Sequence, residues 1–400
     1  MNTQQTTELS ISFAAPVLLA LTLLLVAGPA GSAEPFAAVS RAMQECVSRR
    51  EVAGAVALVG TRDKVLCIQA AGMADIATKE PMPTNAIGWI ASMTKPITAT
   101  AVLMMQEEGK LSVDDPVAKY VPELGELKTA DGKPANLTMR HLLTHTSGMP
   151  EGTPEQYRKA RTLADVIPFY TGRPVKFEPG SKWQYCQSGI NSLGRIVEIV
   201  SGKSFPAFLQ ERLFSPLGMK DTTFHLSPEQ LPRLARTYAK IDGKLQETPI
   251  DFLRGHPPTD HDRYPAPNGG LFSTAPDYAR FCRMILNQGA IDGKRYLKPE
   301  SVKLMTSVQT GDLKTGFTDG NGWGLGWCIV RQPQGTTAML SPGTFGHGGA
   351  YGTQAWIDPV KEVFYVLLVQ RSDFPNADDT EVRRAFQTAA AEALGNGAAR

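Results

Sequence analysis

Gly88-Trp-Ile-Ala-Ser-Met-Thr-Lys-Pro-Ile97 leads into an apolar run that stops at Gly109. This pattern predicts a long buried helix over residues 92–108. Ser92 and Lys95 are three residues apart, so they share one helix face, about one turn from each other. Read alone, the pair also fits an N-cap serine with a solvated lysine. The apolar residues on both sides favour a buried lysine instead, whose lowered pKa lets it accept a serine proton.

Strand patterns lie on both sides of this helix in the sequence, near the two ends of the chain. Ala53–Gly60 and Lys64–Ala71 are apolar runs around a polar turn, which indicates a β-hairpin. Near the C-terminus we predict three strands, the last nearly all apolar and therefore central: Gly322–Val330, Thr353–Asp358 and Glu362–Gln370. Helices are expected over residues 36–50, 138–145, 188–201, 205–214 and 378–394.

This order of elements predicts an α+β fold. Strands from both termini must meet in one antiparallel sheet, which helices flank. We place the sheet lobe at about 34–110 and 265–400, and an inserted, mostly helical lobe at about 111–264. The lobes form one catalytic or binding unit over residues 34–400.

Composition and charge limit the function. The chain has 400 residues with 41 Lys and Arg against 39 Asp and Glu, so no basic excess supports nucleic-acid binding. Five cysteines, with no Cys-x-x-Cys spacing, make neither a disulfide scaffold nor a zinc motif, and we expect most to be buried. These numbers fit a globular enzyme or binding protein.

The N-terminal segment resembles a secretory signal. An almost unbroken apolar stretch from Phe13 to Ala27 is followed by small residues up to Ala33. The stretch is shorter than a membrane-spanning helix needs. We therefore predict a signal peptide over residues 1–33, cleaved after Ala33, and a secreted or periplasmic protein; an uncleaved membrane anchor is the alternative.

Two further segments carry residues able to do chemistry. Tyr185-Cys-Gln187 precedes an apolar helix, so Tyr185 can point into a cleft or serve as a core tyrosine. Gly346-His-Gly-Gly-Ala350 leads into a C-terminal strand, and glycines there mark close approach of a ligand or backbone. His347 can act as an acid or base, as an electrostatic anchor, or as a structural histidine.

Together these segments resemble the penicillin-recognising serine hydrolases. The relevant branch contains class C β-lactamases, D-Ala-D-Ala carboxypeptidases and family VIII carboxylesterases, which carry Ser-x-x-Lys, Tyr-x-Asn and Lys/His-Thr/Gly-Gly in this order. Ser-Met-Thr-Lys-Pro is a form often seen in the esterases. Supporting segments are His141–Gly148, Pro216–Met219 and Gly269–Ala275. The resemblance covers almost the whole mature chain and implies the α/β/α sandwich of the β-lactamase/transpeptidase-like fold.

The resemblance also implies roles. Ser92 would be the nucleophile that forms an acyl-enzyme, while Lys95 and Tyr185 would share the acid and base work. The amides of Ser92 and Ala350 would form the oxyanion hole. His347 would orient substrate or relay a proton. Gln187, Gly348, Gly349 and Ala350 are the predicted substrate-binding residues.

Two departures from the family pattern bear on the substrate. Gln187 stands where the family usually has asparagine, and His347 stands where a dedicated β-lactamase usually has lysine. We expect an exported hydrolase of small esters, and of β-lactams to a lesser degree. The alternatives are a D-amino-acid peptidase acting on cell-wall peptides and a non-catalytic sensor that binds peptidoglycan or β-lactams.

No cofactor or metal is expected. His141 and His145 lack the glutamate of a His-Glu-x-x-His motif, so we expect them to make structural hydrogen bonds. His256 and Asp260 lie in a proline-rich loop that reads as polar surface. The expected partner is a small acyl substrate, with membrane contact only through an uncleaved N-terminal segment.

Overall fold

The computed structural model describes residues 1–4 and 35–395. The predicted signal peptide therefore lies outside the described residues, apart from its first four. No helix in the described ranges is long and apolar enough to cross a membrane. Residues 35–395 lie in one compact unit, which holds every helix and strand described below.

An antiparallel sheet of eight strands is the centre of this unit, in the order β10-β11-β12-β13-β14-β1-β2-β3. Its strands come from two parts of the chain, as the sequence predicts. The N-terminal strands are β1 (Gly54–Thr61), β2 (Val65–Asp75) and β3 (Glu80–Pro81). The C-terminal strands are β10 (Asn321–Trp323), β11 (Cys328–Val330), β12 (Phe345–Gly348), β13 (Gln354–Asp358) and β14 (Val363–Val369).

The two parts meet where β1 pairs with β14, with Ala57 opposite Leu367. Every residue of β14 is buried. Its alternate side chains enter two different apolar clusters, one on each face of the sheet, so Val366 and Leu367 face opposite sides. Two covered faces explain the unbroken apolar sequence of this strand and confirm its central position.

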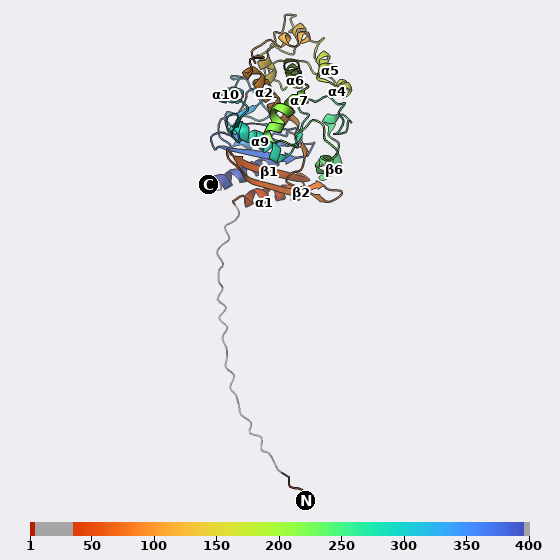
Figure 1. Cartoon of the computed structure of the whole chain (residues 1–400), viewed down its shortest axis with the longest axis vertical. Coiled ribbons are helices and arrows are strands. Elements are labelled where there is room, and N and C mark those ends of the chain that lie inside the picture. The colour runs from red at the N-terminus through yellow and green to blue at the C-terminus, as the bar shows by residue number, and fades with distance from the viewer. Residues whose placement is uncertain (5–34, 396–400) are drawn as a thin grey trace. The chain divides into compact units, whose positions relative to one another are not determined.

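Helices cover both faces. One face packs against α1 (Ala37–Ser48) and α11 (Glu381–Ala393), and the other against α2 (Thr94–Glu107) and α9 (Ala275–Leu286). In Figure 1, α1 lies below β1 and β2, and α9 lies above β1. The predicted α+β class and α/β/α sandwich are confirmed.

The middle of the chain is mostly helical and loop-rich. Thr138 caps α3, and Gly202 ends α6 in the left-handed conformation, as the sequence predicts. The helices here are α3 (Met139–Leu143), α4 (Pro154–Lys159), α5 (Leu163–Val166), α6 (Gln187–Ser201), α7 (Phe205–Leu209) and α8 (Ser215–Leu217). The hairpin of β5 (Thr237–Ile241) and β6 (Lys244–Thr248) was not predicted.

The remaining elements are short. They comprise β4 (Gly88–Trp89) paired with β7 (Phe272–Ser273), β8 (Ala290–Ile291) paired with β9 (Lys294–Arg295), and α10 (Pro299–Met305).

One predicted strand is wrong. Gly322–Val330 is not continuous but forms β10 and β11, which pair with each other across a turn. Gly326 in that turn has φ of 77°, a value that favours glycine. A Cβ there would lie 2.7 Å from the Ala99 Cβ, so the turn packs directly on α2. The sequence does not reveal this turn, because the strands on both sides of it are buried and the whole segment reads as one apolar run.

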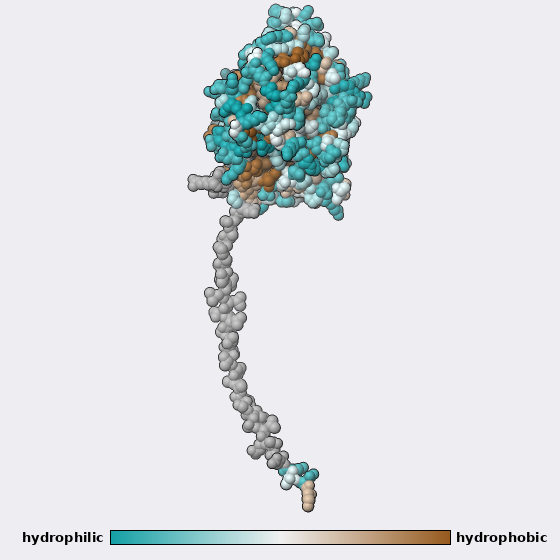
Figure 2. Space-filling model, viewed as in Figure 1, coloured by the Kyte–Doolittle hydropathy of each residue, from teal (hydrophilic) through white to brown (hydrophobic). Residues whose placement is uncertain are grey.

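All five cysteines are buried, as expected, and Cys46, Cys186, Cys282 and Cys328 are free thiols. On the face that Figure 2 shows, hydrophobic residues form separate areas within a largely hydrophilic surface. Most of the hydrophobic side chains in the described residues are buried in the core.

Candidate active site

Ser92 lies just before the long helix rather than inside it. It belongs to a short 3₁₀ turn, Ala91–Met93, and α2 begins at Thr94. Ser92 is partly exposed, while the neighbouring residues through Met105 are buried. Ala91 has φ of 47°, a strained value for a residue with a side chain. The turn thus presents one hydroxyl from an otherwise buried segment.

Lys95 is the partner of this hydroxyl. Its Nζ donates hydrogen bonds to Ser92 Oγ at 3.0 Å and to the Asn268 carbonyl oxygen at 2.6 Å. The side chain is fully buried. Burial lowers the pKa of Lys95 to about 7. A large share of Lys95 is therefore uncharged near neutral pH and can take the Ser92 proton.

Tyr185 lies against Lys95, whose Nζ is 4.5 Å from the centre of the phenol ring. Burial raises the pKa of Tyr185 well above its usual range, although a hydrogen bond with Ser92 opposes this. The phenol therefore stays protonated near neutral pH. Within the acid and base work that the resemblance assigns to the pair, Tyr185 is therefore suited to donate a proton and Lys95 to accept one.

His347 is on β12 itself, not on a loop before a strand. Its Nδ1 is 2.7 Å from the Gly348 carbonyl oxygen, so Nδ1 carries the ring proton. Nε2 then accepts a hydrogen bond from the Tyr185 hydroxyl at 3.3 Å. Burial, together with Lys95, lowers the pKa of His347 to about 3. The neutral ring orients Tyr185 and does not act as a cationic anchor.

The turn after β12 packs against the Ser92 segment. Gly349 is so close to that segment that an added Cβ would lie 2.7 Å from the Ile90 carbonyl oxygen. Ala350 follows it and is exposed. Within the described ranges, the Ala350 amide donates no hydrogen bond. This amide is therefore free to stabilise an oxyanion, as the resemblance implies.

Gln187 begins α6 and is held by Asn268, a residue that the sequence pattern did not reveal. Asn268 Nδ2 donates to Gln187 Oε1 at 2.8 Å, which leaves the amide NH₂ of Gln187 as the donor group for a substrate. The Asn268 carbonyl oxygen also holds Lys95. The only sequence signal was its position directly before Gly269–Ala275, a segment that carries part of the family resemblance.

Two more residues hold the Tyr185 segment: His145, whose structural hydrogen bond was expected, and Glu151, which the sequence did not reveal. His145 is fully buried, its Nδ1 accepts the Cys186 amide at 3.1 Å, and its ring lies 4.4 Å from that of Tyr185. Glu151 Oε1 accepts the Gln187 amide at 2.6 Å, at the N-terminus of α6. Both act on backbone groups, and a sequence pattern does not show such contacts.

His141 and His256 have structural partners. His141 Nδ1 accepts the Thr138 amide at 3.2 Å, which confirms the expected structural hydrogen bond. His256 Nδ1 lies 2.6 Å from Asp260 Oδ2. Within residues 1–4 and 35–395, no group of three or more His, Cys, Asp or Glu side chains is arranged to hold a metal.

Comparison with known proteins decides the family. The beta-lactamase family model matches residues 39–390 of this chain. The chain belongs to the beta-lactamase family. It is a serine hydrolase of that family, with the three motifs arranged around Ser92.

Named relatives within the beta-lactamase family have different activities. Esterase EstB of Burkholderia gladioli is 30% identical over 353 residues, covering 81% of this chain and 87% of EstB. The D-alanyl-D-alanine-carboxypeptidase/endopeptidase AmpH of Escherichia coli is 26% identical over 302 residues, covering 72% and 73%. The solved structure of EstCE1, a hydrolase with promiscuous acyltransferase activity, matches with a TM-score of 0.77 at 23% identity, over 90% and 98% of the chains. That last similarity supports the fold.

Proposed function

We propose that this protein hydrolyses small carboxylic esters through an acyl-enzyme on Ser92. The observation that carries the proposal is the 3.0 Å contact between Ser92 Oγ and a buried lysine whose pKa is about 7. Such a lysine can deprotonate serine without a histidine or a metal. The similarity to EstB supports an ester substrate.

In the proposed first half-reaction, neutral Lys95 takes the Ser92 proton while Oγ attacks the ester carbonyl carbon. The amides of Ala350 and Ser92 stabilise the oxyanion. Tyr185 gives its proton to the alcohol oxygen as the C–O bond breaks, and the ammonium of Lys95 then reprotonates Tyr185. Water attacks the acyl-serine in the second half-reaction, which restores Ser92 and releases the acid.

The neutral state of His347 favours esters over carboxylate-bearing substrates. D-Ala-D-Ala peptides and penicillins carry a carboxylate, which a lysine at this position would pair with. A buried imidazole with a pKa of about 3 supplies no such charge. β-Lactams are therefore expected to be slow substrates. A D-amino-acid peptidase is the second candidate, supported by the similarity to AmpH.

The test compares p-nitrophenyl acetate, nitrocefin and a D-Ala-D-Ala peptide, with wild type and Ser92→Ala. We expect rapid ester hydrolysis, slow nitrocefin hydrolysis and no peptide hydrolysis, all dependent on Ser92. An alkyl phosphonate should add one covalent group to wild type but not to Ser92→Ala by mass spectrometry. The matched control is Ser48→Ala, an exposed serine in α1, which should keep full activity.

Retention of ester hydrolysis by Ser92→Ala would refute the mechanism. Faster cleavage of the peptide than of the ester would instead favour the peptidase. Binding of penicillin without turnover of any substrate would favour a sensor.

We also propose that the protein is exported, with cleavage after Ala33. Expression of the full chain in a bacterial host, followed by N-terminal sequencing of the extracytoplasmic protein, tests this. A mature sequence beginning at Glu34 is the expected result. An intact N-terminus on a membrane-bound protein would support the anchor instead.

A further inference from the structure

Phe317 is an exposed aromatic residue beside the candidate active site. It lies in the loop between α10 and β10, and 44% of its surface is accessible. Gly316 and Gly320, with φ of 81° and 79°, shape the loop on either side of it. Asn376 Nδ2 donates to the Phe317 carbonyl oxygen at 2.8 Å, which pins the loop from the C-terminal part of the chain.

The ring of Phe317 contacts the site through aromatic neighbours. Its centre lies 4.9 Å from that of Tyr185, with an interplanar angle of 72°. It lies 5.8 Å from the Trp183 ring at 77°. Both are edge-to-face contacts, which aromatic pairs favour. The exposed phenyl is therefore held in one orientation next to the proposed proton donor.

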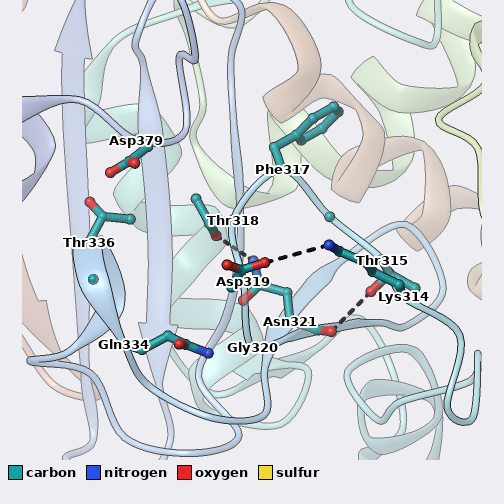
Figure 3. Close-up of a pocket in the computed structure, with 12 residues that line it drawn as sticks. Lys314, Thr315, Phe317, Thr318, Asp319, Gly320, Asn321, Gln334, Thr336 and Asp379 are labelled. Carbon is teal, nitrogen blue, oxygen red and sulfur yellow. Dashed lines mark hydrogen bonds and ion pairs between the residues drawn. The ribbon is translucent and has the colours of Figure 1, made fainter.

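The loop has two different faces. A polar pocket of about 500 Å³ is lined by Phe317 together with Asp319, Gln334 and Thr336, and Figure 3 shows the Phe317 ring pointing away from these three side chains. Phe317 also lines a much smaller cavity of about 10 Å³ that includes His347. The aromatic face of the loop thus belongs to the Tyr185–His347 side, and the polar face to the outer pocket.

This placement identifies the part of the substrate that Phe317 meets. If Tyr185 protonates the departing alcohol oxygen, the group bonded to that oxygen must pass beside Tyr185. Apolar surface that is exposed there is unfavourably hydrated. An apolar group of the substrate that covers this surface removes it from water and so binds more tightly. A polar alcohol would gain nothing from this contact.

We infer that Phe317 and Trp183 form a subsite for the alcohol part of the ester, which selects apolar, aromatic alcohols. The inference rests on the proposed function, because it assigns the leaving group of that reaction. Aromatic rings of substrate and wall pack edge-to-face or offset, as Phe317 already packs on Tyr185.

The experiment uses two ester series with Phe317→Ala, Phe317→Leu and wild type. One series holds acetate constant and varies the alcohol: ethanol, benzyl alcohol and naphthylmethanol, whose oxygens have similar basicity. The other holds ethanol constant and varies the acid: acetate, butyrate and phenylacetate. We expect the benzyl-to-ethyl ratio of kcat/KM to fall about tenfold in Phe317→Ala. The ratios within the acid series should stay the same.

Two further results separate this subsite from a general effect on folding. Phe317→Leu keeps an apolar surface, so its benzyl-to-ethyl ratio should lie between those of Phe317→Ala and wild type. Val360→Ala removes another exposed apolar side chain, 69% accessible and on the turn between β13 and β14, and should leave every ratio unchanged. Deacylation of the common acetyl-enzyme should be equal in all variants, because the alcohol has already left.

An unchanged benzyl-to-ethyl ratio in both Phe317 variants would overturn the subsite. A change confined to the acid series would also overturn it and would place Phe317 beside the acyl group. Neither result bears on the proposed function, which is tested separately by measuring ethyl acetate hydrolysis in Ser92→Ala. Retained hydrolysis in Ser92→Ala would refute the proposed function and the subsite together.

Discussion

Lys95 has an environment that suits a base and not a structural ion pair. Its ammonium meets a hydroxyl and a carbonyl oxygen at hydrogen-bond distance, and within residues 1–4 and 35–395 no carboxylate lies there. A buried charge with only these neutral acceptors is costly, so the uncharged amine becomes accessible near neutral pH.

The first prediction concerns the pH dependence of ester hydrolysis. Because the pKa of Lys95 is about 7, kcat/KM should rise between pH 6 and pH 8 with a midpoint near 7. Lys95→Arg should lose roughly a hundredfold or more at every pH in this range, since guanidinium does not deprotonate. A stopped-flow profile with a phenyl ester measures both. A flat wild-type profile would contradict the assignment of Lys95 as the base.

The second prediction concerns stability. The folded state lowers the pKa of Lys95 from 10.5 to about 7, so the unfolded chain binds its proton more tightly. The cost to folding, on the order of 5 kcal/mol, is complete below pH 7 and declines as the pH rises toward 10.5. Lys95→Met should therefore raise Tm, and more at pH 6 than at pH 9. Lys303→Met, at an exposed position, is the control; a lower Tm for Lys95→Met at pH 6 would contradict this account.

The residues of the site differ in how far the sequence alone could locate them. Ser92, Lys95 and Tyr185 stand in short motifs whose side chains are chemically distinctive. Asn268 and Glu151 act through or upon backbone groups, which any sequence carries. Their role depends on distant segments meeting, and composition or periodicity does not report that.

At the scale of elements, the turn between β12 and β13 is the most constrained part of the site. A Cβ on Gly349 would lie 2.1 Å from Thr353 Oγ1 and 2.7 Å from the Ile90 carbonyl oxygen. Both are far below an ordinary contact distance, so the turn has to move if the Cβ is added. Gly349 thereby fixes the neighbouring Ala350 amide against the Ser92 segment.

The third prediction is that Gly349→Ala lowers kcat/KM for esters by roughly a hundredfold, mainly through kcat, because the displaced amide stabilises only the oxyanion. Gly189→Ala in α6 is the matched control. Its added Cβ would meet only the ordinary contacts of Leu142, at 3.4 Å and beyond, so it should stay within threefold of wild type. Steady-state kinetics with both variants test the point. Equal kcat values for Gly349→Ala and Gly189→Ala would contradict a role of this turn in the oxyanion hole.

Element prediction succeeded where burial was simple. The position of β14 follows from its unbroken apolar run, and the end of α6 follows from one glycine. The prediction failed for β10 and β11. The turn between these two strands is as buried as the strands themselves, so the whole segment reads as one strand. The β5–β6 hairpin carries Lys240, Lys244 and Glu247, so it lacks the apolar signal on which strand prediction depends.

At the scale of the whole molecule, one ion network joins three distant parts of the chain. Glu51 accepts hydrogen bonds from Lys240 Nζ at 2.6 Å and from Arg371 Nη1 at 2.9 Å. Arg371 is buried and also pairs with Asp373 at 2.7 Å. The network lies at the end of the sheet where β1 begins and β14 ends. It therefore links the N-terminal strands to the C-terminal strands.

The fourth prediction is that Glu51→Gln destabilises the protein by about 1–2 kcal/mol at pH 7. The hydrogen bond from Lys240 holds the pKa of Glu51 below its usual 4.5. The stabilisation is therefore complete above pH 4.5 and disappears as the pH falls through the lowered pKa. Urea unfolding at pH 7 and at pH 3.5 measures the difference. An equal loss at both values would contradict the ionic origin, and the exposed Glu45→Gln is the control.

The pairing of β1 with β14 also limits how early the sheet can form during synthesis of the chain. β1 ends at Thr61, but its partner begins at Val363, so the ribosome must add about 300 residues before the seam can close. At usual rates this takes roughly 15–60 s. During that time β1 is paired on one side only, with β2, and the short strand β3 is the only other neighbour of this hairpin among the described strands. The central pairing of the sheet therefore forms only after the last strands have been made.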